Sequence, residues 1–441
     1  MTERTPVVTV FLRHRGDVLL FRRSDAVGSY AGRWGAVAGH VATDEGVTRD
    51  PETAARAEIR EETGLADDAV TLVRAGDPFD VDDGDRRWRV HPFLFDREAR
   101  APEGRASAAR EPRTVETNAE TDEYEWCPPT ELLRRETVPR LWTSYDQVRP
   151  TAATVAEDTT HGSAHLSYRA LECLRDEAAL RAEGRRGRPV REVARALREA
   201  RPAMAVLGNR VNRAMADAGD PTDPTAVERA ASETLAAAFE ADEWAAAWPE
   251  ALGSPASVLT LSRSGTALAA VESAAPDRVF VAESRPAREG VGVAEALAGA
   301  GNEERASESE REVTLHTDAA IGHVLATEAV DAVVVGADAV LADGSVVNKT
   351  GTRLAALAAA REDVPVYVVC AADKVTPTEE PHLESGPATE LYGGEAPLSV
   401  LNPTFDVTPA DLVTGVLTER GVLDDEAVRE VAAEHAALAE W

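Results

Sequence analysis

Three glutamates, Glu58, Glu61 and Glu62, stand close together in one segment of the sequence. If the segment is helical, their i, i+3, i+4 spacing places all three carboxylates on one helix face. Like charges there repel each other by roughly a few tenths of a kcal/mol per pair unless a cation occupies the face. Hard divalent ions such as Mg²⁺ or Mn²⁺ take oxygen ligands and keep water for contact with substrate phosphates. The spacing therefore indicates either a metal site for phosphate chemistry or a solvated acidic face.

The segment around these glutamates carries the signals of one helix, over Pro51–Glu62. The proline at its start suits a first helical turn, and Gly64 suits the stop. Ala54, Ala55 and Ile59 supply an apolar stripe that a sheet could cover.

Strand-like segments surround this helix. Val7–Leu12 and Val18–Phe21 flank a hairpin signal at Arg15–Asp17, and Arg87–Phe95 is a further strand candidate. Glu98–Thr121 is polar, acidic and weakly patterned, so we expect a long surface loop there.

The helix and the loop before it carry a family resemblance. Arg33–Val41 followed by Ala57–Leu65 resembles the box of the Nudix hydrolases, which reads Gly, five residues, Glu, seven residues, then Arg-Glu-apolar-x-Glu-Glu-x-Gly-apolar. Gly39 and Glu45 keep the first spacing, but eleven residues separate Glu45 from the helix motif. Ala57 stands where the family has Arg. The resemblance covers about the first 148 residues.

This resemblance implies an α/β/α sandwich that hydrolyses nucleoside diphosphates linked to another group. It also implies that Glu58, Glu61 and Glu62 hold the metal, Mg²⁺ or Mn²⁺, and are catalytic. Carboxylate-held Mg²⁺ can neutralise pyrophosphate oxygens and lower the pKa of an attacking water. The missing Arg orients the box carboxylates in the family, and Arg56 lies one residue off, about 100° around the helix. A domain that binds nucleotide without cutting it is the open alternative.

From Ser254 onward the hydrophobic period changes. Short apolar runs alternate with helical segments of roughly ten to twenty residues, which is typical of buried parallel strands with crossover helices. The runs are Val258–Leu261, Arg278–Glu283, Val313–Thr317, Asp331–Asp338 and Val364–Cys370. We expect a doubly wound, Rossmann-like parallel sheet, with Asn302–Glu312 as a solvated surface excursion.

Polar residues follow each of these predicted strands. In an open α/β sheet, ligands bind outside the carboxyl ends of the strands. Asn348 and Lys349 are expected to open the helix after the fourth strand, where main-chain N–H groups can hold an anion. Helix caps explain the Ser, Asp and Asn positions one by one, but their convergence with cations suits a small phosphorylated ligand. The other strand-end residues are Ser262, Arg263, Ser264, Glu283, Ser284, Arg285, Asp318 and Asp338.

These residues also carry a resemblance, over about residues 160–441. Glu283–Pro286, Val335–Asp338, Asp343–Thr352, Asn402–Pro409 and Arg201–Ala205 are similar to the translation initiation factor 2B alpha/beta/delta family. That family includes archaeal ribose 1,5-bisphosphate isomerases and is related to methylthioribose-1-phosphate isomerases. The resemblance implies assembly into homo-oligomers through this C-terminal region.

The isomerase members use a Cys and an Asp as an acid/base pair. Carried over, the resemblance makes Asp338 catalytic and Asn348, Lys349 and Arg201 ligand-binding. Ser262, at the Cys position, is a substrate-binding candidate. The sequence positions of Arg263 and Arg285 at strand ends make them further candidates.

Three positions depart from the isomerase pattern. Ser262 replaces the Cys, His161 stands where a substrate-binding Arg precedes Gly, and Glu289 replaces a Gln. A serine hydroxyl is a far weaker proton donor and acceptor than a thiol of pKa about 8.5. Glu289 would repel a phosphorylated ligand unless it is protonated or shielded. A domain that binds a sugar phosphate or nucleotide without catalysis is therefore favoured, with an isomerase and a regulatory initiation-factor-like protein as the alternatives.

Length and charge set the remaining expectations. At roughly 100–200 residues per domain, 441 residues predict two or three domains. We expect a domain over 1–148, a linker over 149–160, a helical subdomain over 161–253 and the parallel-sheet domain over 254–441. The net charge of −31 argues against non-specific binding to nucleic acids or anionic membranes.

The basic residues are almost all Arg, since Lys349 and Lys374 are the only lysines. Dense carboxylates stay hydrated, and their repulsion is screened, when salt is molar, so we favour a high-salt cell over an Arg-rich genome with ordinary acidity. Three scattered cysteines indicate neither a disulfide framework nor a zinc site. No apolar run approaches the ~18 residues of a membrane span, and no signal-peptide pattern opens the chain, so we expect a cytoplasmic protein.

Overall fold

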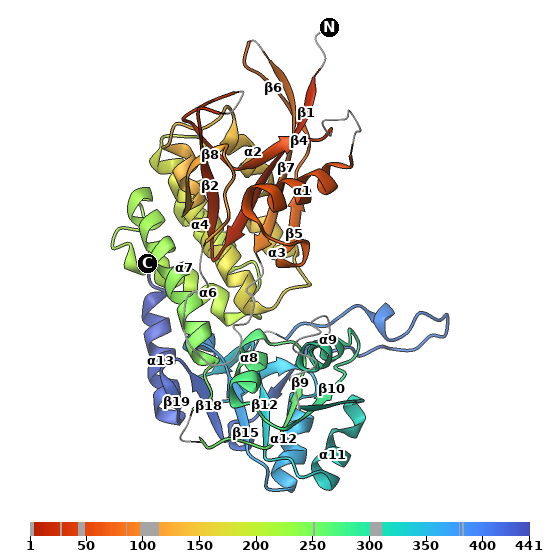
Figure 1. Ribbon diagram of the computed structural model, residues 1–441. Helices are drawn as coiled ribbons and strands as arrows, with labels where there is room; N and C mark the ends of the chain where they lie inside the picture. Colours follow the sequence, from red (N-terminus) through yellow and green to blue (C-terminus); the bar gives the residue numbers. More distant parts are fainter. Residues whose placement is uncertain are drawn as a thin grey trace. The chain divides into compact units, whose positions relative to one another are not determined.

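The computed structural model describes residues 4–26, 29–42, 49–84, 86–97, 114–249, 252–299, 311–378, 380–381 and 383–441. The chain divides into two compact units (Figure 1). The first comprises Met1–Thr151, Glu172–Val190 and Asp223–Ser232, and the second comprises the rest. Glu45, most of the predicted loop Glu98–Thr121 and most of Asn302–Glu312 lie outside the described residues.

The first unit is built on a mixed eight-stranded sheet in which β3-β2-β1-β7-β5 are neighbours. β4 also pairs with β1, β6 with β7 and β8 with β2. The strands predicted from the sequence in this region are confirmed. The strands are β1 (Thr5–His14), β2 (Asp17–Arg23), β3 (Trp34–Gly35), β4 (Val37–His40), β5 (Val70–Ala75), β6 (Phe79–Asp82), β7 (Arg87–Arg97) and β8 (Thr121–Cys127).

Helix α1 (Pro51–Thr63) confirms the predicted helix and covers one face of this sheet. The Asp50 side chain caps it by accepting from two backbone N–H groups of the first turn, and Gly64 ends it at φ 72°. Its stripe of Ala54, Ala55 and Ile59 packs with alternate β1 residues in one core cluster. The helix is thereby fixed against the sheet, with Glu58 and Glu62 half-buried and Glu61 exposed.

The opposite face of the sheet is covered by α2 (Leu141–Val148). Phe11 of β1 points to this side and meets the Tyr145 ring edge-on, with centroids 5.2 Å apart. Leu180, from the C-terminal half of helix α4 (Ser163–Ala182), joins the same core cluster. The sheet therefore lies between helices on both faces, as the sandwich expectation required.

The predicted linker, residues 149–160, contains a short helix, α3 (Ala152–Glu157). Further helices follow in the region predicted to be helical. They are α4, α5 (Val190–Arg198), α6 (Ala205–Asp217) and α7 (Pro224–Ala245). α4 and α7 each contribute one part to the first unit and the other part to the second.

The second unit contains a seven-stranded sheet in the order β11-β10-β9-β12-β15-β18-β19. Six strands are parallel and only the edge strand β19 is antiparallel. If the six parallel strands are numbered in chain order, they lie across the sheet in the order 3-2-1-4-5-6. This is the doubly wound arrangement, and its switch point lies between β9 and β12. The strands are β9 (Ser257–Leu261), β10 (Arg278–Ala282), β11 (Glu312–His316), β12 (Ala332–Val335), β15 (Val366–Val369), β18 (Gly415–Thr418) and β19 (Gly421–Leu423).

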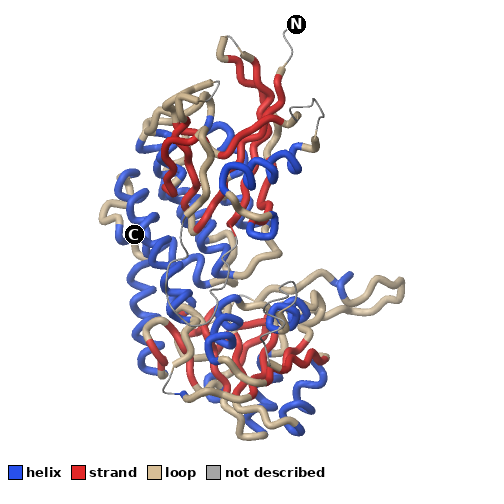
Figure 2. Tube along the Cα trace, viewed as in Figure 1, coloured by secondary structure: helices blue, strands red, loops and turns tan. Residues whose placement is uncertain are grey.

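Helices surround this parallel sheet (Figure 2). All five strands predicted for it are present, and the α/β class is confirmed. The helices that follow its strands are α8 (Gly265–Ala274), α9 (Glu289–Leu297), α11 (Ile321–Thr327), α12 (Thr352–Arg361) and α13 (Asp425–Leu438).

A second, four-stranded sheet of this unit was not predicted. Its order is β16 (Val375–Thr376), β13 (Ala339–Leu341), β14 (Val346–Lys349) and β17 (Phe405–Thr408). The expectation that Asn348 and Lys349 open a helix is wrong, because both residues pair with β17 at the end of β14. Gly351, at φ 113°, reverses the chain before α12 begins. No helix among the described residues is both long and apolar enough to cross a membrane.

Candidate functional site

Two of the predicted metal ligands, Glu58 and Glu62, lie against the end of β4. Glu62 Oε1 accepts a hydrogen bond from the Ala38 backbone N–H at 3.3 Å. Gly39 leaves room for the other carboxylate, because a Cβ atom at this position would lie 1.9 Å from Glu58 Cδ. The spacing of Gly39 before the helix thus has a steric reason.

The electrostatics of this pair are those of crowded carboxylates. Burial is the main cause that raises the pKa of Glu62 to about 8, and the charge of Glu58 adds to it. The Ala38 N–H and the charge of Arg23 act in the opposite direction. No pattern in the sequence predicts that Arg23, on β2, lies near this pair.

Glu61 does not join Glu58 and Glu62 at the end of β4, and its side chain is exposed to solvent. It lies about 60° around the helix from Glu58, on the side away from Glu62. Within the described ranges, no group of three or more His, Cys, Asp or Glu side chains is arranged to hold a metal ion. The structure therefore gathers two of the three glutamates.

Arg56 does not replace the Arg that is missing at position 57. Its Nε donates to Glu52 Oε1 at 3.1 Å, one turn earlier on the helix. Its guanidinium lies over the Phe95 ring, 5.1 Å from the centroid. Both contacts engage the Arg56 guanidinium, and neither involves Glu58 or Glu62.

The donor set nevertheless fits a hard divalent cation. Carboxylate oxygens are the ligands that Mg²⁺ and Mn²⁺ prefer. Two carboxylates held together by the fold, one of them with a pKa raised towards neutrality, form a site where a positive charge is favourable.

In the second unit, the loops after three neighbouring parallel strands are tied together. The Ser262 N–H, after β9, donates to Ser284 Oγ at 2.6 Å, and Ser262 adopts φ 65°. Asp318, after β11, accepts from the N–H groups of Ser284 and Arg285, at 2.8 and 2.7 Å. Asp318 therefore fixes the loop geometry, and its two oxygens are both engaged.

The candidate arginines around these loops have protein partners. Arg285, whose side chain is 65% exposed, lies 3.5 Å from Glu283. Arg263 donates to the carbonyl oxygen of Thr160. Arg201 donates to the carbonyl of Asp158 and lies 3.1 Å from Glu384 Oε2.

Asp338 follows β12, at the switch point of the sheet, and its N–H donates to the Val347 carbonyl at 2.9 Å. Asn348 is buried, and its Nδ2 donates to Thr352 Oγ1 at 2.9 Å. Lys349 Nζ lies 2.6 Å from Oε1 of Glu289, the first residue of α9. Glu289, which departs from the family pattern, is thus the ion-pair partner of Lys349, a candidate ligand-binding residue.

Comparison with known proteins identifies both parts of the chain. Residues 159–425 match the model of the Initiation factor 2 subunit family, and residues 3–148 match that of the NUDIX domain. The chain belongs to the Initiation factor 2 subunit family. Its N-terminal part is a NUDIX domain, so the predicted fusion is confirmed.

Curated relatives of the initiation factor 2 subunit domain are named as isomerases. The methylthioribose-1-phosphate isomerase of Albidiferax ferrireducens is 44% identical over 121 residues, which is 25% of this chain and 34% of that protein. A putative methylthioribose-1-phosphate isomerase of Methanothermobacter thermautotrophicus is 41% identical over 123 residues, 25% of this chain and 39% of that protein. The match spans little more than a third of the length of these relatives.

Among solved structures, the chain is similar to the translation initiation factor eIF-2B of Pyrococcus horikoshii OT3. The TM-score is 0.51 at 26% sequence identity, and the similarity covers 62% of this chain and 94% of that one.

Lys374 is a residue of this domain that the sequence reasoning did not single out. It is only 4% exposed, and its Nζ donates to the carbonyl of Ala337, the residue before Asp338. The chain has two lysines. Lys374 contacts the residue before Asp338, and Lys349 ends β14, the strand in which Val347 accepts from the Asp338 N–H. This scarcity of lysine was the available signal.

Cys370 does not supply the thiol that is missing at position 262. It is fully buried in β15's C-terminal extension, and burial raises its pKa to about 12. A thiol with that pKa carries almost no thiolate at neutral pH.

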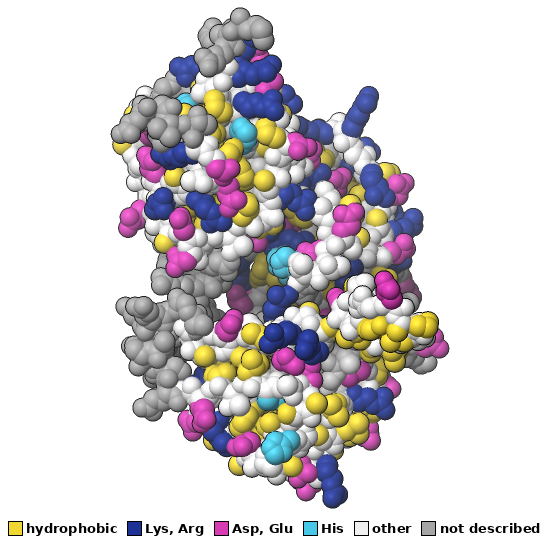
Figure 3. All heavy atoms as spheres, turned by 90° about the vertical axis from the view of Figure 1, so that its right-hand side faces the viewer, with side chains coloured by type: hydrophobic (Ala, Val, Ile, Leu, Met, Phe, Trp, Pro, Cys, Tyr) yellow, Lys and Arg dark blue, Asp and Glu magenta, His cyan; other side chains and the backbone are white. Residues whose placement is uncertain are grey.

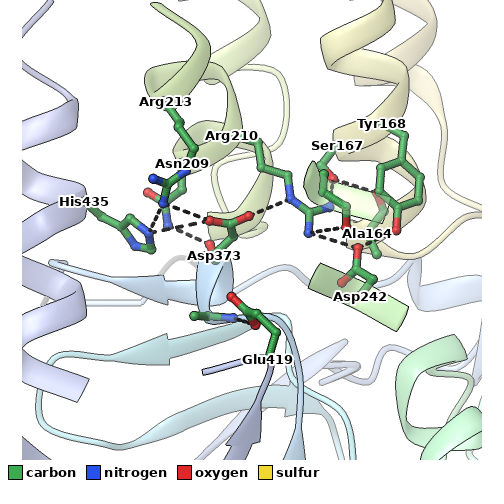
Figure 4. Close-up of polar contacts among 12 residues, drawn as sticks. Ala164, Ser167, Tyr168, Asn209, Arg210, Arg213, Asp242, Asp373, Glu419 and His435 are labelled. Atoms are coloured by element: carbon green, nitrogen blue, oxygen red, sulfur yellow. Dashed lines mark hydrogen bonds and ion pairs between the residues drawn. The ribbon is translucent and has the colours of Figure 1, made fainter. Parts of the chain in front are cut away.

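A buried polar network holds the loop that carries Lys374 (Figure 4). Asp373 accepts from Arg210 Nε at 3.0 Å and from Arg213 Nη2 at 3.2 Å. Burial alone would raise the pKa of Asp373, but His435, Arg210 and Arg213 together hold it well below its usual range. Arg210 also lies 2.9 Å from Asp242 of α7.

Proposed function

We propose that the NUDIX domain hydrolyses a nucleoside diphosphate derivative with the aid of Mg²⁺ or Mn²⁺. The observation that supports this proposal is the pair of carboxylates, Glu58 and Glu62, that Gly39 and the Ala38 N–H hold against β4. Glu58 and Glu62 would hold the cation, with Glu61 beside them on the same helix. The bound cation would supply charge neutralisation for the pyrophosphate and a lower pKa for the attacking water.

The test is hydrolysis by the purified full chain. We expect MgCl₂ or MnCl₂ to support release of a phosphorylated product from ADP-ribose or a related nucleoside diphosphate derivative. Glu58→Gln and Glu62→Gln should each lower the rate by at least about a hundredfold. Glu52→Gln, on the same helix but facing Arg56, is the matched control and should keep the rate.

Binding of the metal has its own readout. Mn²⁺ should raise the unfolding temperature of the wild-type chain, and this shift should disappear in Glu58→Gln and Glu62→Gln. A metal-dependent shift without product from any substrate would favour the alternative of a domain that binds nucleotide without cutting it.

For the initiation factor 2 subunit domain, we propose binding of a phosphorylated sugar or nucleotide at the strand ends. The loops after β9, β10 and β11 are tied together by Ser262, Ser284 and Asp318, and the ion pair of Lys349 with Glu289 joins the end of β14 to α9, which follows β10. We propose that the ligand-binding side chains are Arg201, Ser262, Arg263, Arg285, Asn348 and Lys349. A thermal-shift screen of phosphorylated metabolites in molar KCl tests this, because a ligand stabilises the fold whether or not it reacts.

A sugar-phosphate isomerase is a second candidate, favoured by the names of the curated relatives and by Asp338 at the switch point. Ser262 or a water would then replace the thiol in proton transfer, with Asp338 as its partner. Turnover of ribose 1,5-bisphosphate or methylthioribose 1-phosphate that is lost in Asp338→Asn would establish this activity. No turnover, together with co-purification of a translation factor, would favour a regulatory role.

We also propose that this domain forms homo-oligomers. Large apolar side chains are exposed along the segment before β17, and Leu401 is 83% exposed. Figure 3 shows a gathering of hydrophobic side chains on one face of the molecule. The leucines of this segment are Leu383, Leu391, Leu398 and Leu401. Light scattering should give a mass above one chain for the wild type and a monomer for Leu391→Asp combined with Leu401→Asp.

A further inference from the structure

The ion pair between Glu289 and Lys349 lies within the proposed ligand site of the initiation factor 2 subunit domain. Its 2.6 Å distance joins two side chains that are mostly buried, 20% and 14% exposed. Glu289 begins α9 after β10, whereas Lys349 ends β14 of the smaller sheet. The contact therefore forms only in the folded domain, and it engages the cation that a ligand phosphate would use.

The other oxygen of Glu289 has no partner. Oε2 is buried and accepts no hydrogen bond. A buried acceptor left unpaired costs free energy, so it favours a ligand that brings an N–H or O–H group. The two oxygens of Glu289 therefore both bear on ligand binding: Oε1 pairs with Lys349, and Oε2 is an unused acceptor.

The backbone holds Glu289 in this position. A Cβ atom on the next residue, Gly290, would lie 1.9 Å from the carbonyl oxygen of Ala282 at the end of β10. The Gly290 N–H also donates to the Glu283 carbonyl at 3.2 Å. The first turn of α9 therefore sits directly on the strand end, and Glu289 is carried into the site by a close backbone contact.

We propose that Glu289 determines the specificity of this site. It neutralises Lys349 and presents Oε2 to a hydroxyl or amino group, so the site takes a sugar or nucleoside monophosphate with a free donor at this position. A second phosphate at the same position is excluded, because it would face the carboxylate. This inference rests on the proposed ligand-binding function.

The neighbouring cations do not relieve that repulsion. Arg285 and Arg288 both lie beside Glu283, at 3.5 and 3.3 Å. Arg285, Arg288 and Lys349 each already face a carboxylate, so a second phosphate would have to displace one of these carboxylates. A hydroxyl in the same place would displace nothing and would satisfy Oε2.

Two ligands that differ only at this position test the inference. Ribose 5-phosphate carries a hydroxyl at the carbon where ribose 1,5-bisphosphate carries a phosphate. We would measure their affinities for the full chain in molar KCl by calorimetry. We expect the wild type to bind ribose 5-phosphate at least about tenfold more tightly than the bisphosphate.

Substitutions at Glu289 separate the effect of its charge on ligand affinity from the effect of its size. Glu289→Gln keeps the shape and removes the charge, so it should bind the bisphosphate at least about tenfold more tightly than the wild type does. Glu289→Asp keeps the charge and should keep the preference for ribose 5-phosphate. Glu295→Gln makes the same change at an exposed position of α9 and should bind both ligands as the wild type does.

Equal affinity of wild type and Glu289→Gln for the bisphosphate would overturn the inference and leave the proposed ligand binding intact. Tighter binding of the bisphosphate than of ribose 5-phosphate by the wild type would overturn it as well. No binding of either sugar phosphate or of AMP by any variant would overturn the proposed function, and the inference with it.

Discussion

Glu62 is a residue whose surroundings oppose its charge. Its carboxyl is buried beside Glu58, and its pKa of about 8 compares with an ordinary value of 4.5. Between these two pH values the folded chain keeps a proton that the unfolded chain releases. The free energy of unfolding therefore falls as pH rises through this interval, because the ionised form is the disfavoured one in the fold.

Glu62→Gln removes this pH dependence, so its effect should grow with pH. Near pH 4.5 the variant and the wild type should have similar stability, since both carry a neutral side chain. At pH 8 to 9 the variant should be more stable by an amount on the order of a few kcal/mol. Urea unfolding of both chains between pH 4.5 and 9 measures this difference.

Added Mn²⁺ provides the complementary measurement. A cation at Glu58 and Glu62 favours the ionised carboxylate, so it should stabilise the wild type more at pH 8 than at pH 6. A difference between the wild type and Glu62→Gln that stays constant across this pH range would contradict the assignment.

Among the elements, the sequence predicted those whose own residues determine them. The helix over Pro51–Glu62 has its apolar stripe within the segment and its cap and stop beside it. Five of the six parallel strands coincide with short apolar runs, whereas β18 was not predicted. β13 and β14 have three and four residues, too few for a period to be visible. The sequence therefore predicts a helix at Lys349, and its pairing with Glu289 follows only from the folded arrangement of β14 and α9.

In the candidate metal site, too, the sequence predicted only the contacts that local residues determine. The motif spacing placed Glu58 beside Gly39, because helix geometry and a tight backbone approach follow from local sequence. The direction of Arg56 was open, since Glu52 and Phe95 compete for it and only the folded sheet brings Phe95 close. Arg23 reaches Glu62 from another strand, which no local pattern records.

The contact between β4 and α1 should not tolerate a side chain at Gly39. In Gly39→Ala, the new methyl group would collide with the Glu58 carboxylate and displace it. We expect metal-dependent hydrolysis to fall at least about tenfold, with the fold retained. Gly322→Ala is the control, because a Cβ atom there meets no other atom within 4 Å. Hydrolysis at the wild-type rate by Gly39→Ala would rule out this steric role.

The polar network of Figure 4 joins α6, α7 and α13 to the loop after β15. Asp373→Asn would leave Arg210 buried without one of its two carboxylate partners. We expect a loss of about 3 kcal/mol or more in the free energy of unfolding, since a buried guanidinium that loses a carboxylate partner destabilises the fold. Glu430→Gln, exposed on α13, should change it by less than about 0.5 kcal/mol in the same urea titration. Equal midpoints for both variants would show that the network is not a stabilising element.

At the scale of the whole molecule, one compact unit contains the NUDIX domain together with segments of the region that matches the Initiation factor 2 subunit family. Arg13 of the NUDIX sheet is buried and lies 3.0 Å from Glu172 of α4, a residue within the initiation factor 2 subunit match. Tyr145 donates to Asp176 at 3.0 Å, and Arg134 lies 2.6 Å from Glu228 of α7. These pairs are distant in sequence, so composition and spacing gave no signal that the fusion shares helices.

The acidity of the chain belongs to this scale as well. A net charge of −31 repels itself in the compact state, whereas the two proposed sites would use cations or a metal to bind phosphate. The screening length falls from about 10 Å at 0.1 M salt to about 3 Å at 1 M, which removes most repulsion between surface carboxylates.

The unfolding temperature should therefore rise steeply between 0.1 and 2 M KCl. Sorbitol, which is excluded from protein surfaces but screens no charge, is the control and should raise it much less. Equal unfolding temperatures at the two KCl concentrations would show that surface repulsion does not limit this fold.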